Sequence, residues 1–267
     1  GLLTRTDFVG DFRKLLQTLE RVYGKPVDVE FAVNFMPDGK SYMVNLLQCR
    51  PLQVQGTHNP YVPQVECPAE GVLLAGRGAV VGHSRGDRLD WLVLVVPEVY
   101  GPMPERDRHR VSRAVGAVNR ALAAVDVGAL AIGPGRWGTH MPSLGVPVRF
   151  SEISHMTAIC EMMMMHEFLT PDVSLGTHFF GELVEMNILY FALFPGREGN
   201  RLNLAALMQA PNRLVELAPE AADQAQVLRV VRADDLNPDG VWLVADGVAR
   251  QVTVSLCPPM LRGSVGV

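Results

Sequence analysis

The sequence has few charged residues. Of its 267 residues, 24 are Lys or Arg and 28 are Asp or Glu, so charged residues make up 19% of the chain and the formal net charge is −4 at pH 7. An average soluble domain carries roughly 25% charged residues. Duplex nucleic acid and anionic membranes are bound mainly through an excess of Lys and Arg. The near-neutral charge balance therefore disfavours both as partners.

Long apolar segments and paired cysteines are also lacking. The longest apolar runs, such as residues 91–96, fall far short of the roughly 20 residues that span a bilayer, so we expect a soluble protein. The four cysteines are Cys49, Cys67, Cys160 and Cys257, and none forms a C-x-x-C pair. This wide spacing argues against a zinc site or a disulfide framework and indicates a reducing cytoplasm.

What is abundant is apolar sequence. Hydrophobic residues make up 48% of the chain, so most of it is expected to fold, and its length suggests two domains. Composition divides it into a domain at residues 1–53, a proline-rich linker at 54–70 and a second domain at 71–267. The chain begins with Gly1 rather than Met. We therefore expect a C-terminal fragment of a longer chain, whose remaining N-terminal part would be a partner of this one.

The order of apolar patterns predicts an α/β fold with a mixed α+β sheet. Spacing of three and four residues indicates helices, and short β-branched or alternating runs indicate strands. Asp246 and Gly247 form a pair that is favoured in two-residue hairpin turns. The predicted helices are 7–23, 104–125 and 177–186, and the predicted strands are 27–35, 42–49, 72–75, 91–96, 129–132, 146–150, 157–162, 188–194, 241–245 and 249–255.

The first predicted hairpin carries a candidate site. If its turn centres on Gly39, the residue numbers of each cross-strand pair add up to 78. Glu30 then pairs with Gln48 on a polar face, and Asp28 pairs with Arg50 at its end. Mg²⁺ prefers oxygen ligands, which Glu30 and Gln48 can supply, and Arg50 can bind a phosphate with two hydrogen bonds. The alternative is an ordinary solvated face. The same register predicts an apolar face that pairs Val29 with Cys49, Phe31 with Leu47 and Phe35 with Met43.

A glycine-rich loop after residues 129–132 is a second candidate site. Gly133, Gly135 and Gly138 surround Arg136, and glycines let backbone N–H groups approach an anion that a guanidinium can also bind. Thr177 begins a predicted helix, whose free N–H groups also favour anions. We hypothesise that phosphate, sulfate or a nucleotide phosphate binds between these groups. The alternative is a tight turn in which Trp137 fills the core and Arg136 donates to a carbonyl.

Several motifs carry a family resemblance. Residues 28–32 (Asp-Val-Glu-Phe-Ala) and 47–51 (Leu-Gln-Cys-Arg-Pro) resemble the closing hairpin of the nucleotide-binding domain in the phosphoenolpyruvate synthase and pyruvate phosphate dikinase family, whose fold is of the ATP-grasp type. Residues 132–138, 144–148 and 174–180 are similar to the tail of a subset of dikinase-like proteins. The resemblance implies that residues 1–53 are the end of the ATP-grasp C-terminal lobe and that 71–267 form a mixed α/β domain.

The resemblance also implies a chemistry. Glu30 and Gln48 would hold the Mg²⁺ that bridges the ATP phosphates, and Arg50 would act as a catalytic residue that touches the transferred phosphoryl group. The expected cofactors are ATP and Mg²⁺, and the expected activity is ATP-dependent phosphoryl transfer, with the isolated fragment incomplete and inactive. The alternative function is a regulatory or interaction module that binds a small anionic metabolite through the Gly133 to Gly138 loop.

Overall fold

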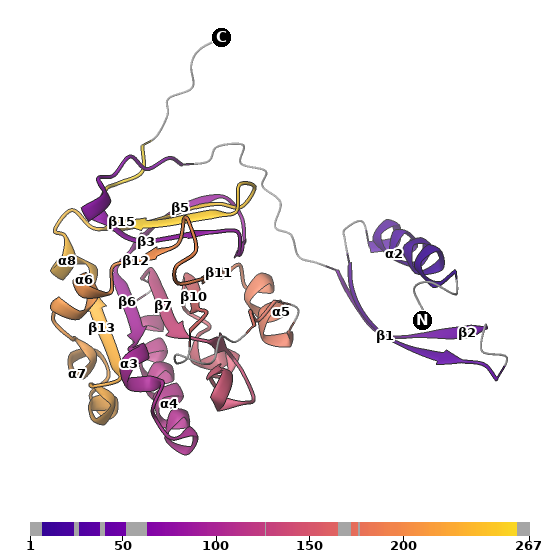
Figure 1. Cartoon of the computed structure of the whole chain (residues 1–267), viewed down its shortest axis with the longest axis horizontal. Helices are drawn as coiled ribbons and strands as arrows, with labels where there is room; N and C mark the ends of the chain where they lie inside the picture. The colour runs from indigo at the N-terminus through magenta and orange to yellow at the C-terminus, as the bar shows by residue number, and fades with distance from the viewer. Residues whose placement is uncertain are drawn as a thin grey trace, which may run out of the picture. The chain divides into compact units, whose positions relative to one another are not determined.

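The chain divides into two compact units, Gly1–Thr57 (unit 1) and His58–Val267 (unit 2). The computed structural model describes residues 7–23, 27–37, 41–51, 63–125, 127–164, 172–175 and 177–260 (Figure 1). In this part of the chain no helix has the length and apolar character needed to cross a membrane. The elements combine helices with mixed and antiparallel sheets, which confirms the predicted α/β class.

Unit 1 consists of one helix and one hairpin. Helix α2 (Phe8–Tyr23) is followed by strands β1 (Val27–Phe35) and β2 (Tyr42–Pro51), which pair in antiparallel fashion. All three elements were predicted from apolar spacing, and the helix carries Asp11 in its first turn and Arg21 in its last, as the helix dipole favours. The predicted turn centre, Gly39, lies outside the described residues.

The register of this hairpin follows the prediction only at its open end. Glu30 pairs with Gln48, but the register shifts directly after Glu30, so that Phe31 pairs with Leu46 and Phe35 with Tyr42. The predicted partners Leu47 and Met43 are therefore wrong. The cause is a β-bulge at Leu47, an extra residue in β2 that alternation of residue types does not reveal.

The centre of unit 2 is a six-stranded sheet of order β13-β6-β7-β10-β11-β4. Its four inner strands run parallel, and the two edge strands run antiparallel to their neighbours. Inner strands of a parallel sheet are covered on both faces and read as continuous apolar runs, which is how the sequence predicted them. The strands are β13 (Leu228–Arg232), β6 (Trp91–Val95), β7 (Ala129–Pro134), β10 (Ala158–Met162), β11 (Leu189–Leu193) and β4 (Val80–Val81).

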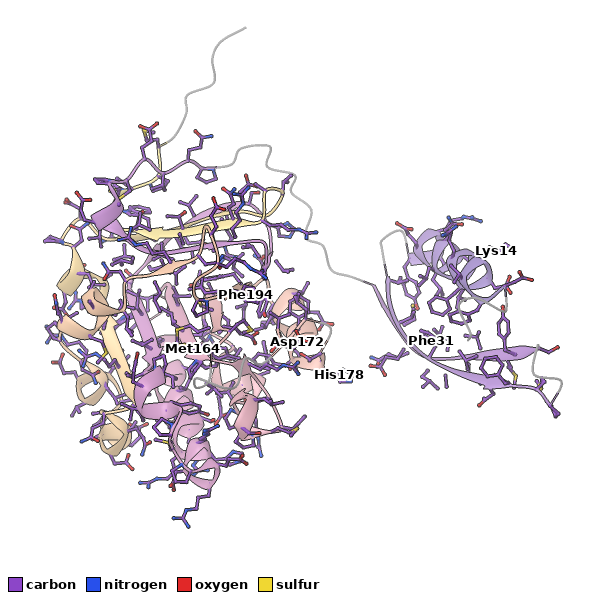
Figure 2. The ribbon with its side chains drawn as sticks, viewed as in Figure 1. Lys14, Phe31, Met164, Asp172, His178 and Phe194 are labelled. Carbon is purple, nitrogen blue, oxygen red and sulfur yellow. A yellow bond between two sulfur atoms is a disulfide. The ribbon has the colours of Figure 1, made fainter. Side chains whose placement is uncertain are left out.

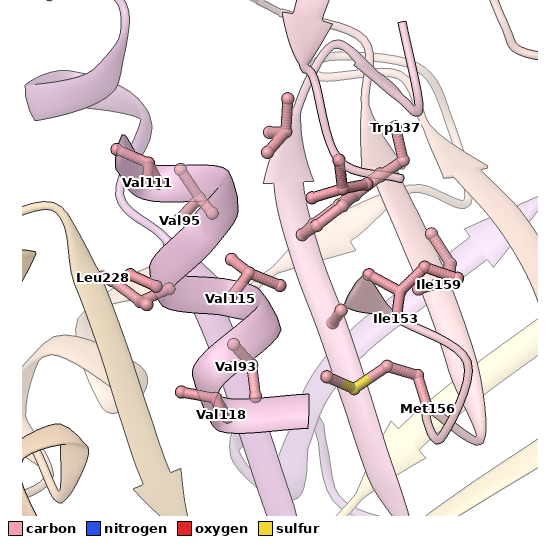
Figure 3. Close-up of a cluster of buried hydrophobic side chains, with 14 of the residues drawn as sticks. Val93, Val95, Val111, Val115, Val118, Trp137, Ile153, Met156, Ile159 and Leu228 are labelled. Atoms are coloured by element: carbon pink, nitrogen blue, oxygen red, sulfur yellow. The ribbon is translucent and has the colours of Figure 1, made fainter. Parts of the chain in front are cut away.

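Helices cover one face of this sheet. Val93 and Val95 of β6 lie in the same buried cluster as Val111, Val115 and other residues of α4 (Figure 3). The alternate residues of β6 belong to the opposite face, because side chains alternate along a strand. The face that carries Val93 and Val95 is covered by α4 (Glu105–Ala123), α5 (His178–Glu185) and the short α7 (Leu214–Leu217).

A second, antiparallel sheet covers the other face, so that unit 2 has three layers. Leu92 and Leu94 of β6 share a buried cluster with Leu74, Leu243 and Val254, which come from the five-stranded sheet. That sheet has the order β12-β3-β15-β14-β5. Its strands are β12 (Arg201–Leu202), β3 (Val72–Arg77), β15 (Gln251–Ser255), β14 (Val241–Asp246) and β5 (Arg85–Leu89).

Short elements account for two wrong predictions. The predicted strand 146–150 is limited to β9 (Gly145–Val146), because Pro147 lacks an N–H group and the chain turns into the helical turn η3 (Phe150–Glu152). Strands β14 and β15 form the predicted hairpin, but Asp246 pairs with Gln251 and the loop has four residues rather than two. The other short elements are η1 (Ala69–Gly71), α3 (Pro97–Tyr100), β8 (Arg136–Trp137), η2 (Pro142–Leu144), α6 (Leu204–Gln209), η4 (Pro219–Gln224) and α8 (Ala233–Leu236).

The prediction against a disulfide is wrong, and the argument from cysteine spacing for a reducing cytoplasm therefore loses its basis. Cys67 and Cys257 form a disulfide with a sequence separation of 190 residues. The spacing of the cysteines along the sequence could not predict this pairing, because it does not show that the two ends of unit 2 meet in space. Cys49 and Cys160 are free thiols, as expected from their spacing.

Candidate functional site

Packing against α2 fixes which face of the first hairpin is open. The ring of Phe12 lies 4.3 Å from that of Phe31, centroid to centroid, and the ring of Phe8 lies 5.9 Å from it. Phe31 therefore faces the helix, and Figure 2 shows it there. Because adjacent residues of a strand point to opposite faces, Glu30 belongs to the face that α2 does not cover.

On this open face the structure pairs the two predicted oxygen donors. Glu30 is exposed, Gln48 is half-buried, and the two are Cα partners across the hairpin. Each also makes an interaction within the molecule. A carboxylate and an amide on directly opposed positions of an antiparallel pair have Cβ atoms about 5 Å apart. Their oxygens can therefore reach a common ligand.

The third predicted residue of this site is only partly described. The backbone of Arg50 pairs with that of Asp28, as predicted, two positions along β2 from Gln48. The side chains of Arg50 and Asp28 lie outside the described part of the structure. The phosphate contact assigned to Arg50 stays a prediction.

A hydrogen bond ties the helix of unit 1 to the hairpin. The hydroxyl of Tyr42 donates to a carboxylate oxygen of Asp11 at 2.6 Å, and this bond raises the pKa of Tyr42 to about 12. Tyr42 lies next to Phe8, with ring centroids 5.9 Å apart. The open polar face of the hairpin is thus supported from behind by an aromatic cluster and one hydrogen bond.

The second predicted site, the glycine loop, follows the carboxyl end of β7. Three of its backbone N–H groups donate inside the protein: Gly135 to the Met162 carbonyl at 2.7 Å, Trp137 to Glu161 at 2.9 Å and Gly138 to the Val146 carbonyl at 3.0 Å. These donors are not directed at a ligand. Backbone donors that already have partners contribute little to anion binding.

Two of the glycines have a steric role. A Cβ atom on Gly133 would lie 2.6 Å from the Trp137 ring, and one on Gly138, whose φ is +70°, would lie 2.3 Å from Phe179. Neither position accepts a larger side chain without displacing a buried aromatic ring. Trp137 is 1% exposed. These contacts agree with the alternative interpretation, a tight turn with Trp137 in the core.

The other predicted donors of this site also have partners. The guanidinium Nε of Arg136 donates to the Asp172 carbonyl at 2.5 Å. The Thr177 hydroxyl donates to the Ser174 carbonyl and accepts from the Phe180 N–H at 3.2 Å, which makes it the N-cap of α5. The loop and the helix start thus both contact the segment 172–174. The predicted anion pocket between them stays a prediction.

The most constrained polar group near this loop was missed by sequence analysis. Glu161 is 0% exposed at the end of β10 and accepts from Trp137 N, Ser174 N (3.1 Å), Ser174 Oγ and Tyr190 Oη (2.5 Å). Burial raises the pKa of its carboxyl, and the four hydrogen bonds oppose this. An acidic residue inside the apolar run 158–162 was the signal that could have revealed it, because a buried carboxylate needs hydrogen-bond donors.

Arg108 is a second buried polar group, and no carboxylate among the described residues forms an ion pair with it. Its guanidinium donates to the carbonyls of Met103 at 3.1 Å, Gly101 at 2.8 Å and Pro142 at 2.5 Å, and it lies 5.0 Å from the Tyr100 ring centroid. It is 5% exposed. Arg108 therefore joins the start of α4 to two loops and is not available to a ligand.

Comparison with known proteins identifies a relationship for the N-terminal region. Residues 5–66 match the family model described as the AMP/ATP-binding domain of pyruvate phosphate dikinase. Neither the curated proteins nor the solved structures yielded a match. The matched region contains α2 and the hairpin with Glu30 and Gln48. This part of the chain is thus similar to the AMP/ATP-binding domain of pyruvate phosphate dikinase.

Proposed function

We propose that the chain takes part in ATP-dependent phosphoryl transfer of the phosphoenolpyruvate synthase and pyruvate phosphate dikinase type, and that the hairpin of unit 1 binds the phosphates of Mg-ATP. The observation that carries the proposal is the cross-strand pair of Glu30 and Gln48 on the face that α2 leaves open. The relationship of residues 5–66 to an AMP/ATP-binding domain supports it independently.

The donor set of this hairpin fits Mg²⁺. A carboxylate and an amide offer the hard oxygen ligands that Mg²⁺ prefers, and Mg²⁺ is commonly bound by one or two protein groups together with substrate phosphates and water. Among the described residues there is no group of three or more His, Cys, Asp or Glu that could enclose a metal ion. We assign Glu30 and Gln48 as its protein ligands in a complex with ATP. When bound, Mg²⁺ would neutralise charge on the phosphate oxygens.

The protein's own contribution is position and charge. Glu30 and Gln48 would fix the orientation of the phosphates relative to β1 and β2, and Arg50 would hold an oxygen of the transferred phosphoryl group with its planar guanidinium. Phosphoryl transfer depends mainly on such positioning and on electrostatic stabilisation. We propose that residues 1–53 correspond to the end of the ATP-grasp lobe and that the reaction takes place in the cytoplasm, where ATP is the common phosphoryl donor.

The alternative, a metabolite-binding module around Arg136, has weaker support. Its backbone donors and the Arg136 Nε already have partners inside the protein. The terminal guanidinium nitrogens of Arg136 would have to supply the main contacts to an anion. We therefore assign the nucleotide site to unit 1 and retain the loop as a second candidate for a small anion.

Calorimetric titration of Mg-ATP onto the full chain tests this proposal. We expect Glu30→Ala and Gln48→Ala each to weaken Mg-ATP binding at least tenfold, since even indirect supports of a metal site change affinity by roughly 10- to 100-fold. Binding of ATP without Mg²⁺ should change much less. Glu20→Ala removes an exposed carboxylate of α2 and serves as the matched control. Equal Mg-ATP affinity in Glu30→Ala and Glu20→Ala would refute the proposal.

A further inference from the structure

The two ends of unit 2 form one structure on its five-stranded sheet. We call residues 63–68 and 256–260 the terminal strap. Its halves pair as an isolated antiparallel bridge between Gln64 and Met260, where the Met260 N–H donates to the Gln64 carbonyl at 2.8 Å. A Cβ atom on Gly86 of β5 would lie 3.2 Å from Pro63 and 3.9 Å from Pro259. Both halves of the strap therefore lie against β5.

The only covalent bond between the two halves, within the described residues, is the disulfide of Cys67 and Cys257. Both residues are half-buried, and their neighbours Glu66, Pro68 and Pro258 are exposed. The disulfide therefore lies near the surface of unit 2, with Gly71 packed against its sulfurs. Apart from the disulfide, the described halves of the strap are joined by the bridge between Gln64 and Met260, and the neighbouring strands of the sheet begin at Val72 and end at Ser255.

The two free cysteines provide a contrast. Cys160 is 0% exposed in the middle of the six-stranded sheet, and burial raises the pKa of its thiol well above the usual value, which suppresses the reactive thiolate. Cys49 is half-buried on β2 of unit 1 and belongs to the other unit. Within unit 2, thiol–disulfide chemistry is thus confined to the strap.

We propose that Cys67 and Cys257 form a thiol–disulfide exchange site whose reduction by a dithiol releases the terminal strap. A thiolate of the dithiol attacks one of the two sulfurs, the S–S bond breaks, and a mixed disulfide forms. The second thiol of the reagent then displaces the protein sulfur. The dithiol is oxidised to its disulfide by two electrons, and the two cysteine sulfurs are reduced and take up two protons.

Release should be local, because among the described residues of the strap Leu256 alone packs against an apolar core of unit 2. Leu256 is also held by two hydrogen bonds, from its own N–H to the Gly71 carbonyl at 2.9 Å and from Asn237 Nδ2 to its carbonyl at 2.7 Å. The disulfide also closes a loop that contains nearly all of unit 2, and long closed loops restrict the unfolded chain most. Reduction should therefore expose the strap first and also lower the melting temperature of unit 2 by about 5 °C or more.

Peptide mapping tests whether the site exists. Protein kept without reductant is alkylated in the folded state and digested. We expect a cross-linked pair of peptides that contain Cys67 and Cys257, alkylation at Cys49, and none at Cys160. Dithiothreitol should convert the cross-linked pair into two alkylated peptides. Separate alkylation of Cys67 and Cys257 without any reductant would overturn the proposal.

Hydrogen exchange tests the consequence. Reduction should speed exchange in residues 63–68 and 256–260 by roughly tenfold or more while β7 and β10 stay protected. The double variant Cys67→Ser/Cys257→Ser, without reductant, should exchange like the reduced protein, and Cys49→Ser should exchange like the oxidised one. Unchanged exchange of the strap after complete reduction would refute its release, even if the disulfide itself is present.

Discussion

The two units differ in what they do with their polar residues. Unit 2 encloses polar groups such as Glu161 and Arg108 and supplies each with several hydrogen bonds. In unit 1, Phe8 is the one hydrophobic residue that is fully buried among those described, and Glu30 is exposed. Buried polar groups with complete hydrogen bonding specify a fold, whereas accessible oxygens on a stable backbone can serve a ligand. This difference supports our proposal that unit 1 binds the ligand and that the polar motifs of unit 2 are structural.

The difference extends to apolar side chains. Several large hydrophobic side chains of unit 1 are exposed, whereas those of β6, β7, β10 and β11 in unit 2 are almost entirely enclosed. A small unit buries a smaller fraction of its surface and has a smaller core. The exposed hydrophobic residues of unit 1 are Val9, Val22, Tyr23, Phe31, Phe35, Met36, Met43, Leu46 and Leu47.

The largest effect is expected from Glu161→Ala. The substitution leaves Trp137 N, Ser174 N and the Tyr190 hydroxyl without their acceptor in a buried site. Loss of one partner from a buried charged network costs about 3 to 5 kcal/mol, so the melting temperature of unit 2 should fall by roughly 10 °C. Thermal unfolding of the full chain measures this. Mg-ATP affinity should stay unchanged. A parallel loss of Mg-ATP affinity in a folded variant would contradict the division of roles between the two units.

A smaller effect concerns the pH dependence of unit 2. The pKa of Glu161 is raised in the folded state, mainly by desolvation. At pH values between the pKa of Glu161 in the unfolded state and its pKa in the folded state, the native state binds more protons than the unfolded state. The stability that Glu161 contributes is therefore complete below the pKa of the unfolded state and falls as the pH rises through the pKa of the folded state. Denaturant unfolding of wild type and Glu161→Gln from pH 4 upward measures the difference. The stability of wild type relative to the variant should decrease with pH, and an increase would contradict this assignment.

The smallest effect is expected from Arg136→Ala. Its Nε donates one hydrogen bond to the Asp172 carbonyl, and a bond from a charged donor contributes about 1.5 to 3 kcal/mol at most, less at an accessible position. We expect a loss of about 1 kcal/mol in unit 2 and no change in Mg-ATP affinity. Titration with inorganic phosphate tests the anion pocket directly. If Arg136→Ala weakened phosphate binding by roughly 30-fold, this would establish the pocket. Arg113→Ala, at an exposed position of α4, is the control.

Local patterns predicted most of the longer elements and few of their partners, and they missed β13 (Leu228–Arg232) and β5 (Arg85–Leu89). The helix 7–23, the first hairpin and the buried parallel strands follow from apolar spacing, because each pattern reflects the faces of its own element. The Glu30 and Gln48 pair was also predictable, because both residues belong to one hairpin. The bulge at Leu47 was not, since one extra residue leaves the alternation on either side intact.

Contacts between distant segments account for the rest. The acceptor of the Trp137 N–H is Glu161, 24 residues away, and Cys67 bonds with Cys257 across 190 residues. No local sequence pattern predicts such a pairing. For this reason the glycine loop was interpreted as a set of open donors, whereas the structure supplies partners for them from β10 and β9.

The most direct test of the central claim is an NMR titration of the full chain with Mn²⁺ and ATP, in which the paramagnetic ion broadens the amide signals nearest to it. We expect the signals of Glu30 and Gln48 to lose intensity first, the effect to require ATP, and Gly135 and Gly138 to be affected less. Strongest broadening at Gly135 and Gly138 would contradict the central claim, since the metal–nucleotide complex would then lie at the glycine loop of unit 2 and not on the hairpin of unit 1.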